Sequence, residues 1–322
     1  MKIFEDTIKI DNTFTNKYIT EKDLLFDLET TGLSRKFCHI YMIGTGYIEG
    51  NFLHTMLFFA EDITEERAII NEFIKRTRPF ERLITYNGNR FDIPFFKERL
   101  DSLMIDFDLD SFDSLDIYAR LKKLKHLLLL PGMKQKDIEK FLGIERDDKY
   151  DGGKLIEVYK SYQIRPDDES EYLLMIHNKE DIIGMSKILS VLSYEGIKTL
   201  TINDLSKEFS SDRYTFETTT DLSIPKPIRI VSDDVYLILD SNKLKGSIQT
   251  TNGYMKKYFP NPDEYLYHLE DERIIPKVIV SKADMKKYRK VSKEECFVEI
   301  DIKDVTDNLI IENIYSCLKN SF

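Results

Sequence analysis

Residues 24–33 read LLFDLETTGL, a largely apolar stretch that carries two acidic residues. The apolar residues 24–28 predict a buried strand, in which side chains two positions apart face the same side. Asp27 and Glu29 therefore point together, while Phe26 and Leu28 point to the opposite face. Two neighbouring carboxylates repel each other, so the pair needs a cation or a shared proton. The alternative, an exposed strand edge, is disfavoured because LLFDL is too apolar.

The segments around this strand predict an α/β domain, followed by a region of different character. Helix 64–77 is expected to begin with Thr64 as its N-cap, and Gly143 to end a group of helices. Other strands are predicted at residues 39–48, 52–59 and 82–86, and other helices at 91–102, 114–143 and 169–192. From about residue 200, Thr, Ile, Val and Tyr alternate with polar residues, which predicts mostly β structure. We therefore expect an α/β domain at residues 1–198 and a β-rich accessory domain at residues 199–322.

A second acidic position follows the strand at residues 82–86. Residues 84–96 read ITYNGNRFDIPFF, so that Asn87 and Gly88 form a turn and Asp92 falls in the first turn of the next helix. The alternative explanation of Asp92 is that acids favour the first turn of any helix, where they complement its dipole.

A third acidic position lies in the long helix, where residues 172–183 read YLLMIHNKEDII. His177 and Asp181 are four residues apart and so share one helical face with Leu174 and Met185. An ionised Asp in an apolar stripe is costly unless it is paired or bound to a metal. Gly184 leaves space beside it. The alternative is an ion pair with a Lys or Arg from elsewhere in the chain.

The three motifs indicate more together than separately. If four carboxylates converge, each close pair repels by ~4 kcal/mol at a separation of ~4 Å and an effective dielectric constant of ~20. Several such pairs rival the whole stability of a domain, ~5–15 kcal/mol. Bound cations resolve this repulsion, and oxygen ligands favour magnesium or manganese over zinc.

Composition and charge are those of an ordinary globular protein. The 322 residues are 42% hydrophobic, and their net charge of −10 argues weakly against a nonspecific nucleic-acid binder without excluding a nuclease. The three cysteines, Cys38, Cys296 and Cys317, are not spaced like the ligands of a zinc site. We therefore expect them to be reduced thiols in a cytoplasmic protein. With neither a signal peptide nor an apolar run of membrane length, we expect no membrane association.

Together, the motifs resemble those of the DEDD superfamily of 3′–5′ exonucleases, and in particular its YprB-like members, which are predicted RNase H-like exonucleases. The similar stretches are FDLETTGL, ITYNGNRFDIPFF, SLDIYARL, FLGI and HNKEDIIGMSKIL, and they span about residues 24–192. The resemblance implies an RNase H-like mixed five-stranded sheet flanked by helices.

The resemblance also implies a two-metal-ion phosphodiesterase that removes nucleotides from 3′ ends. The metal ligands would be Asp27, Glu29, Asp92 and Asp181, which would hold two Mg²⁺ or Mn²⁺ ions, and His177 would be the general base. His177 stands four residues before Asp181, a spacing that the superfamily otherwise uses for tyrosine. Its alternative role is to orient a ligand.

Motif position also suggests contacts with a nucleic-acid substrate, DNA or RNA. Thr30 and Thr31 would position the terminal nucleotide, Leu33 would wedge against its base, and Asn87 would hold the strand near Asp92. The alternative for Leu33 and Asn87 is ordinary packing and turn formation. Protein partners are not indicated by the sequence.

Two other functions stay open on the same fold: a nonhydrolytic nucleic-acid-binding or adaptor module, and an endonuclease. The complete set of four acids and a histidine favours the enzyme. The TTGL segment favours action at strand ends, by analogy with the superfamily. A basic run at residues 282–290 is interpreted as a solvated helix face in preference to a phosphate-binding surface.

Overall fold

The computed structural model describes residues 1–11, 13–147, 152–232, 234–259, 261–292 and 294–320. The chain divides into two compact units, and the first combines Met1–Lys125 with Leu129–Leu192. The second combines His126–Leu128 with Ser193–Phe322.

The first unit is built on a six-stranded sheet in the order β1-β4-β3-β2-β5-β6. The strands β1 to β4 pair antiparallel, whereas β5 runs parallel to β2 and β6 parallel to β5. The strands are β1 (Lys2–Lys9), β2 (Asp23–Thr30), β3 (Ile40–Glu49), β4 (Phe52–Phe59), β5 (Arg82–Thr85) and β6 (Asp113–Asp116). The apolar segment that holds Asp27 is thus an interior strand of a mixed sheet, as predicted.

The sheet has one strand more than the five expected, and this additional strand is β1. It extends the sheet by pairing with β4 along its whole length. Most of its side chains are exposed or half-buried, as suits an edge strand. The mixed charge of residues 2–9 is therefore what kept this strand from being predicted.

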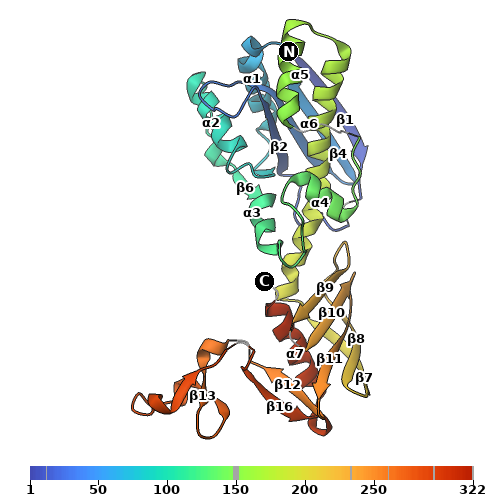
Figure 1. The fold of residues 1–322 in the computed structure, drawn as a ribbon. Coiled ribbons are helices and arrows are strands. Elements are labelled where there is room, and N and C mark those ends of the chain that lie inside the picture. The colour runs from blue at the N-terminus through green and yellow to red at the C-terminus, as the bar shows by residue number, and fades with distance from the viewer. Residues whose placement is uncertain (12, 148–151, 233, 260, 293, 321–322) are drawn as a thin grey trace. The chain divides into compact units, whose positions relative to one another are not determined.

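Helices cover both faces of this sheet (Figure 1). They are α1 (Glu66–Thr77), α2 (Asp92–Ser102), α3 (Ile117–Leu121), α4 (Gln135–Leu142), α5 (Gly152–Ile164) and α6 (Asp168–Ile188). On one face, Phe26 of β2 contacts Phe73 of α1 and Phe96 of α2, with ring centroids 5.3 and 5.7 Å apart. On the other face, α5 and α6 pack against β3 and β4 through Tyr159 and Leu174. The alternation of β2 consequently turns Asp27 and Glu29 toward the α6 face.

Three helix boundaries differ from the sequence expectations. A 3-10 turn, Ile63–Glu65, precedes α1, and its N-cap is Asp62, whose side chain accepts a hydrogen bond from the Thr64 N–H at 2.9 Å. The N-cap of α1 itself is Glu65, so the prediction of Thr64 was wrong. The segment predicted as helical from residue 114 begins instead with strand β6. Helix α6 ends at Ile188 and continues as a 3-10 helix, Leu189–Lys198. Gly143 does end α4, in the left-handed conformation with φ of 76°.

The second unit is largely β, as predicted. Its main sheet has seven strands, with β16-β12-β11-β10-β9 in order, β8 paired to β11 and β7 paired to β8. A separate sheet has the order β14-β13-β15. The elements are β7 (Ile202–Ser210), β8 (Arg213–Thr220), β9 (Ile228–Ser232), β10 (Val235–Asp240), β11 (Lys243–Thr251), β12 (Tyr254–Tyr258), β13 (Tyr265–His268), β14 (Arg273–Pro276), β15 (Tyr288–Lys290), β16 (Phe297–Asp301) and α7 (Asp307–Asn320).

The basic run at residues 282–290 does not form the helix face that was expected. It covers a short 3-10 turn, Met285–Lys287, and strand β15, which pairs with β13. Arg289 within it pairs with Glu295 at 2.9 Å. Pairing with β13 holds Tyr288–Lys290 extended at the edge of the three-stranded sheet.

The three cysteines are free thiols. Among the helices of the described segments, none is both long enough and apolar enough to cross a bilayer.

Candidate active site

Strand β2 carries Asp27 and Glu29 on the sheet face that α6 contacts. Asp27 lies opposite Gly44 of β3 in the sheet register. Its Oδ2 accepts a hydrogen bond from Nδ2 of Asn178, a buried residue of α6, at 2.7 Å. Gly44 makes this contact possible, because a Cβ there would lie 2.0 Å from Oδ1 of Asn178. A buried amide therefore orients the Asp27 carboxylate.

Asp92 lies in the first turn of α2, as predicted, and reaches β2. Its Oδ1 accepts a hydrogen bond from the backbone N–H of Leu28 at 3.2 Å, and the residue is 5% exposed. Leu28 stands between Asp27 and Glu29, so this bond brings the third acid to the acidic segment of the strand. A generic interaction with the helix dipole does not require such burial.

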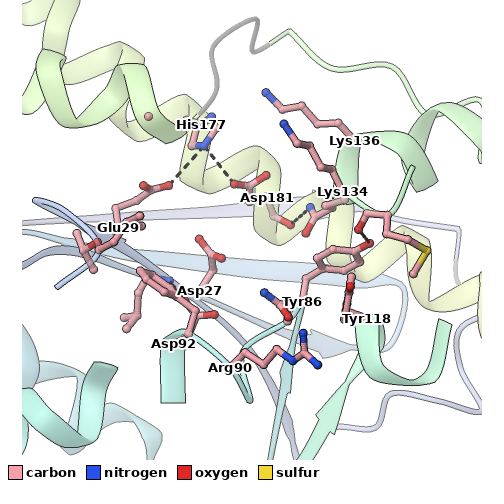
Figure 2. Close-up of a pocket in the computed structure, with 18 of the residues that line it drawn as sticks. Asp27, Glu29, Tyr86, Arg90, Asp92, Tyr118, Lys134, Lys136, His177 and Asp181 are labelled. Carbon is pink, nitrogen blue, oxygen red and sulfur yellow. Dashed lines mark hydrogen bonds and ion pairs between the residues drawn. The ribbon is translucent and has the colours of Figure 1, made fainter. Parts of the chain in front are cut away.

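Helix α6 brings His177 and Asp181 to the same place (Figure 2). Nε2 of His177 lies 3.5 Å from Oε1 of Glu29 and 3.3 Å from Oδ2 of Asp181. His177 is buried, and the hydroxyl of Tyr41 lies 3.4 Å from the other oxygen of Glu29. The imidazole thus bridges the acids of β2 and α6.

The ion pair that the sequence left as an alternative for Asp181 is also present. Nη1 of Arg146 lies 2.7 Å from Oδ1 of Asp181 and 3.0 Å from Oε1 of Glu139 on α4. Because Oδ2 of Asp181 faces His177, the two oxygens of this carboxylate have different partners. Asp181 is paired with an arginine and belongs to the acidic cluster at the same time.

Burial makes the ionisation of three of these acids unfavourable. It raises the pKa of Asp27 well above its ordinary range, and the charges of Asp92, Asp181 and Glu29 raise it further. Burial also raises the pKa of Glu29 to about 7, against the favourable charge of His177. The pKa of Asp92 rises to about 7 for the same reason, although backbone N–H donors lower it in part. These three acids therefore need positive charge beyond that of Arg146 in order to ionise in their ordinary pH range.

The donor set fits divalent cations. One carboxylate oxygen each from Glu29 and Asp181 and a ring nitrogen of His177 lie within 4.8 Å of one another, so the two carboxylates are close enough to share one ion beside the imidazole. Asp27 and Asp92 add carboxylates at the same cleft. Oxygen-rich sites of this kind favour Mg²⁺ or Mn²⁺.

The acids form the floor of a cleft of about 880 Å³. Side chains with positive charge or aromatic rings also line it, namely Arg90, Lys134, Lys136, Tyr86 and Tyr118. Figure 2 shows Lys134 and Lys136 extending from the start of α4 toward the side of the cleft where His177 lies. The cleft thus pairs an acidic floor with a cationic and aromatic wall.

Three of the four residues expected to contact substrate line the cleft. Leu33 lines the cleft and is 80% exposed, and Thr30 and Asn87 also line it. Thr31 is not among the described residues that line the cleft. The hydroxyl of Thr30 donates to the Gly32 carbonyl at 2.9 Å, and that of Thr31 accepts from the His39 N–H at 2.9 Å. Both hydroxyls therefore hold the turn itself.

Sequence reasoning missed the roles of Arg146 and Asn178 and the contact of Asp116 with Asn87. Asp116 caps α3 and also accepts the backbone N–H of Asn87 at 2.9 Å. This bond holds Asn87 in the left-handed conformation, with φ of 64°. Asn178 could have been noticed as a polar residue in the same long helix as His177, whereas Arg146 stands in a segment without periodicity.

Comparison with protein families agrees with this fold. A family model described as the RNase H superfamily matches residues 24–193, which is more than half of the chain. No curated protein matches the sequence.

Among solved structures, a family B DNA polymerase from the archaeon Pyrobaculum calidifontis is 14% identical, with a TM-score of 0.45. The match covers 93% of this chain and 46% of that one, so this chain spans about half of the polymerase. The zinc-bound complex of E. coli exonuclease I with single-stranded DNA is 13% identical, with a TM-score of 0.32, and the match covers 93% of this chain and 73% of that one. On the family match over residues 24–193, the chain belongs to the RNase H superfamily.

Proposed function

We propose that this chain is a metal-dependent 3′–5′ exonuclease of the YprB-like kind, hydrolysing phosphodiester bonds of DNA or RNA. One observation carries the proposal: acids from β2, from the start of α2 and from α6 line a single cleft. Their burial raises the pKa values of Asp27, Glu29 and Asp92, so the arrangement is unfavourable without cations. Residues 1–198 would carry this activity, with residues 199–322 as an accessory domain.

Asp27, Glu29, Asp92 and Asp181 would hold two Mg²⁺ or Mn²⁺ ions. When bound, such ions activate a water nucleophile and stabilise the charge that develops on the phosphate and the leaving oxygen. Asn178 and the Leu28 N–H keep Asp27 and Asp92 pointing into the site.

His177 would take the proton of the attacking water at Nε2. Histidine suits this role at neutral pH because the unperturbed pKa of an imidazole is about 6.5. Once protonated, Nε2 lies within ion-pair distance of Glu29 and Asp181, at 3.5 and 3.3 Å, which stabilises the imidazolium. The same contacts support the alternative role of orienting these two acids.

The wall of the cleft supports a nucleic-acid substrate. Lys134, Lys136 and Arg90 offer positive charge for backbone phosphates, although the whole chain has a net charge of −10. Tyr86 and Tyr118 lie with ring centroids 6.0 Å apart and offer aromatic surface for bases. Charge concentrated beside the acids guides a polyanion to the site without making the whole surface basic.

At the other side of the cleft, the exposed Leu33 would wedge against the terminal base. Because the hydroxyl of Thr30 is used within the turn, this residue would contact the nucleotide mainly through backbone groups. Thr31, which is not among the described residues that line the cleft, would support the turn through its bonds with His39. Asn87 would hold the strand near Asp92.

The experiment is incubation of the full chain with 5′-end-labelled DNA and RNA oligonucleotides in Mg²⁺, Mn²⁺ or chelator. We expect a ladder that shortens from the 3′ end with cations and no product in chelator. Asp27→Ala and Asp181→Asn should abolish the ladder. Asp101→Asn, on the exposed face of α2, is the matched control and should leave it unchanged.

A circular single-stranded substrate separates the alternatives. An exonuclease leaves the circle intact while degrading the linear form. Cleavage of the circle would make the protein an endonuclease. Binding of linear substrate without hydrolysis in any cation would support the nonhydrolytic module and overturn the proposal.

A further inference from the structure

Arg146 is a charged residue placed almost inside the acidic cluster. Its side chain is only 8% exposed, although it lies outside any helix or strand. Besides Asp181 and Glu139, it has Glu180 within reach, with Nε 3.4 Å from Oε2 of Glu180. Three carboxylates on two helices thus share one guanidinium, and the mechanism above does not use it.

The arrangement limits what Asp181 can offer a cation. Oδ1 is engaged by Nη1 of Arg146 at 2.7 Å, while Oδ2 lies 3.3 Å from Nε2 of His177. Only Oδ2 belongs to the side shared with Glu29. A carboxylate held in this way can bind an ion through one oxygen and cannot rotate to chelate it with both.

Residues of α4 also support the orientation of Asp181. Nε2 of Gln135 donates to the Asp181 carbonyl and to Oε1 of Glu139, both at 2.9 Å. Glu139 fits against α6 because residue 184 is glycine, where a Cβ would lie 2.0 Å from Oε1 of Glu139. The space beside Asp181 that Gly184 provides is therefore filled by α4. The same helix follows Lys134 and includes Lys136, so it joins the Asp181 support to the cleft wall.

We propose that Arg146 is a positioning residue that restricts Asp181 to one-oxygen binding and, through its fixed charge, weakens the affinity of the site for cations. A guanidinium keeps its charge at every accessible pH, so it repels any ion bound at Asp181. The inference rests on the proposed function. Its benefit would be a defined ligand geometry, obtained at the expense of affinity.

Two substitutions separate charge from geometry. Arg146→Gln removes the charge and the fork, so Mn²⁺ should bind about tenfold or more tightly, while turnover falls about tenfold or more because Asp181 is no longer held. Arg146→Lys keeps the charge but cannot bridge Glu139 and Asp181 in one plane. It should leave Mn²⁺ affinity within about threefold of wild type and still lose turnover.

Mn²⁺ affinity is measured by calorimetry on the full chain without nucleic acid, and turnover on the labelled oligonucleotide. Arg76→Gln makes the same charge change at an ion pair of α1 with Glu5 and Glu72 and should alter neither quantity. Because Arg146→Gln leaves the buried Glu139 without its partner, Arg146→Gln with Glu139→Gln is the second variant. It should fold and keep the tighter Mn²⁺ binding.

The proposal is overturned if the double variant binds Mn²⁺ no more tightly than wild type, or if both single variants keep full turnover. Equal losses of affinity in Arg146→Gln and Arg146→Lys would also overturn it, since they would indicate a purely structural role. Failure of the proposed function is distinct: the wild type would then bind Mn²⁺ without hydrolysing any oligonucleotide, and the affinity comparison would still apply.

Discussion

Replacing Asp92 with asparagine should make the cation-free protein more stable while abolishing its activity. The carboxyl group is buried, and its pKa in the folded state rises from 3.8 to about 7. Folding with Asp92 ionised at pH 8 therefore costs about 4 kcal/mol. Asparagine keeps an acceptor oxygen for the Leu28 N–H but must still bury an amide, so we expect about half of this cost to be recovered.

The expected gain of about 2 kcal/mol corresponds to a rise in Tm of roughly 4–8 °C for a unit of this size. The gain depends on pH in a definite direction. Because the pKa is raised in the folded state, the unfolded state loses its proton first, and stability falls as pH rises from about 4 to about 7. At pH 5 the gain from asparagine should therefore be close to zero.

The assay is thermal unfolding in chelator at pH 5 and pH 8. Asp116→Asn is the matched control, because Asp116 accepts the backbone N–H groups of Asn87 and Asn89 and the amide would lose one of these bonds. It should lower Tm at both pH values. A lower Tm for Asp92→Asn at pH 8, or an equal rise at both pH values, would refute the claim that this acid is electrostatically unfavourable without cations.

Three further predictions concern the same site. His177→Ala should keep Mn²⁺ binding but lose about 10²–10⁴-fold in rate, and an unchanged rate would leave His177 only an orienting role. Gly44→Ala should weaken Mn²⁺ binding about 10–100-fold by displacing Asn178 from Asp27, and a normal titration would contradict that contact. Because cations must displace protons from Glu29 and Asp92, whose pKa values lie at about 7, Mn²⁺ affinity should rise from pH 6 to pH 8. A flat affinity over this range would contradict the pKa values.

The parts of the fold that could be predicted are those with a local pattern. The apolar stretch around Phe26 and Leu28 predicts a buried strand, and period-2 alternation then places Asp27 and Glu29 on the opposite face. The structure has this alternation, with Phe26 in the α1 and α2 core. The four-residue spacing of His177 and Asp181 likewise predicts their shared face, because helix geometry depends on near neighbours in sequence.

The parts that could not be predicted depend on contacts distant in sequence. Strand β1 has no apolar face to reveal it, and it exists because β4 offers an edge. Arg146 meets Asp181 across 35 positions, and no spacing rule identifies such a partner. The sequence did raise a basic partner for Asp181 as an alternative, and the structure adds that pairing and the acidic cluster occur together.

The environment of a glycine is a second feature that the sequence alone does not reveal. Gly44 reads only as a glycine within a strand, and its purpose appears when Asn178 from α6 occupies the space that a Cβ would need. The role of Gly184 was anticipated only in part, since the space it leaves is filled by Glu139. A glycine in the sequence indicates that another group approaches closely, but it does not identify that group.

Titration calorimetry with Mn²⁺ at pH 8 measures whether the four acids share cations. We predict two Mn²⁺ ions bound per wild-type chain and loss of both in a variant that combines Asp27→Asn with Asp181→Asn. If the wild-type chain bound Mn²⁺ no more tightly than this variant, the four acids would not form a cation site.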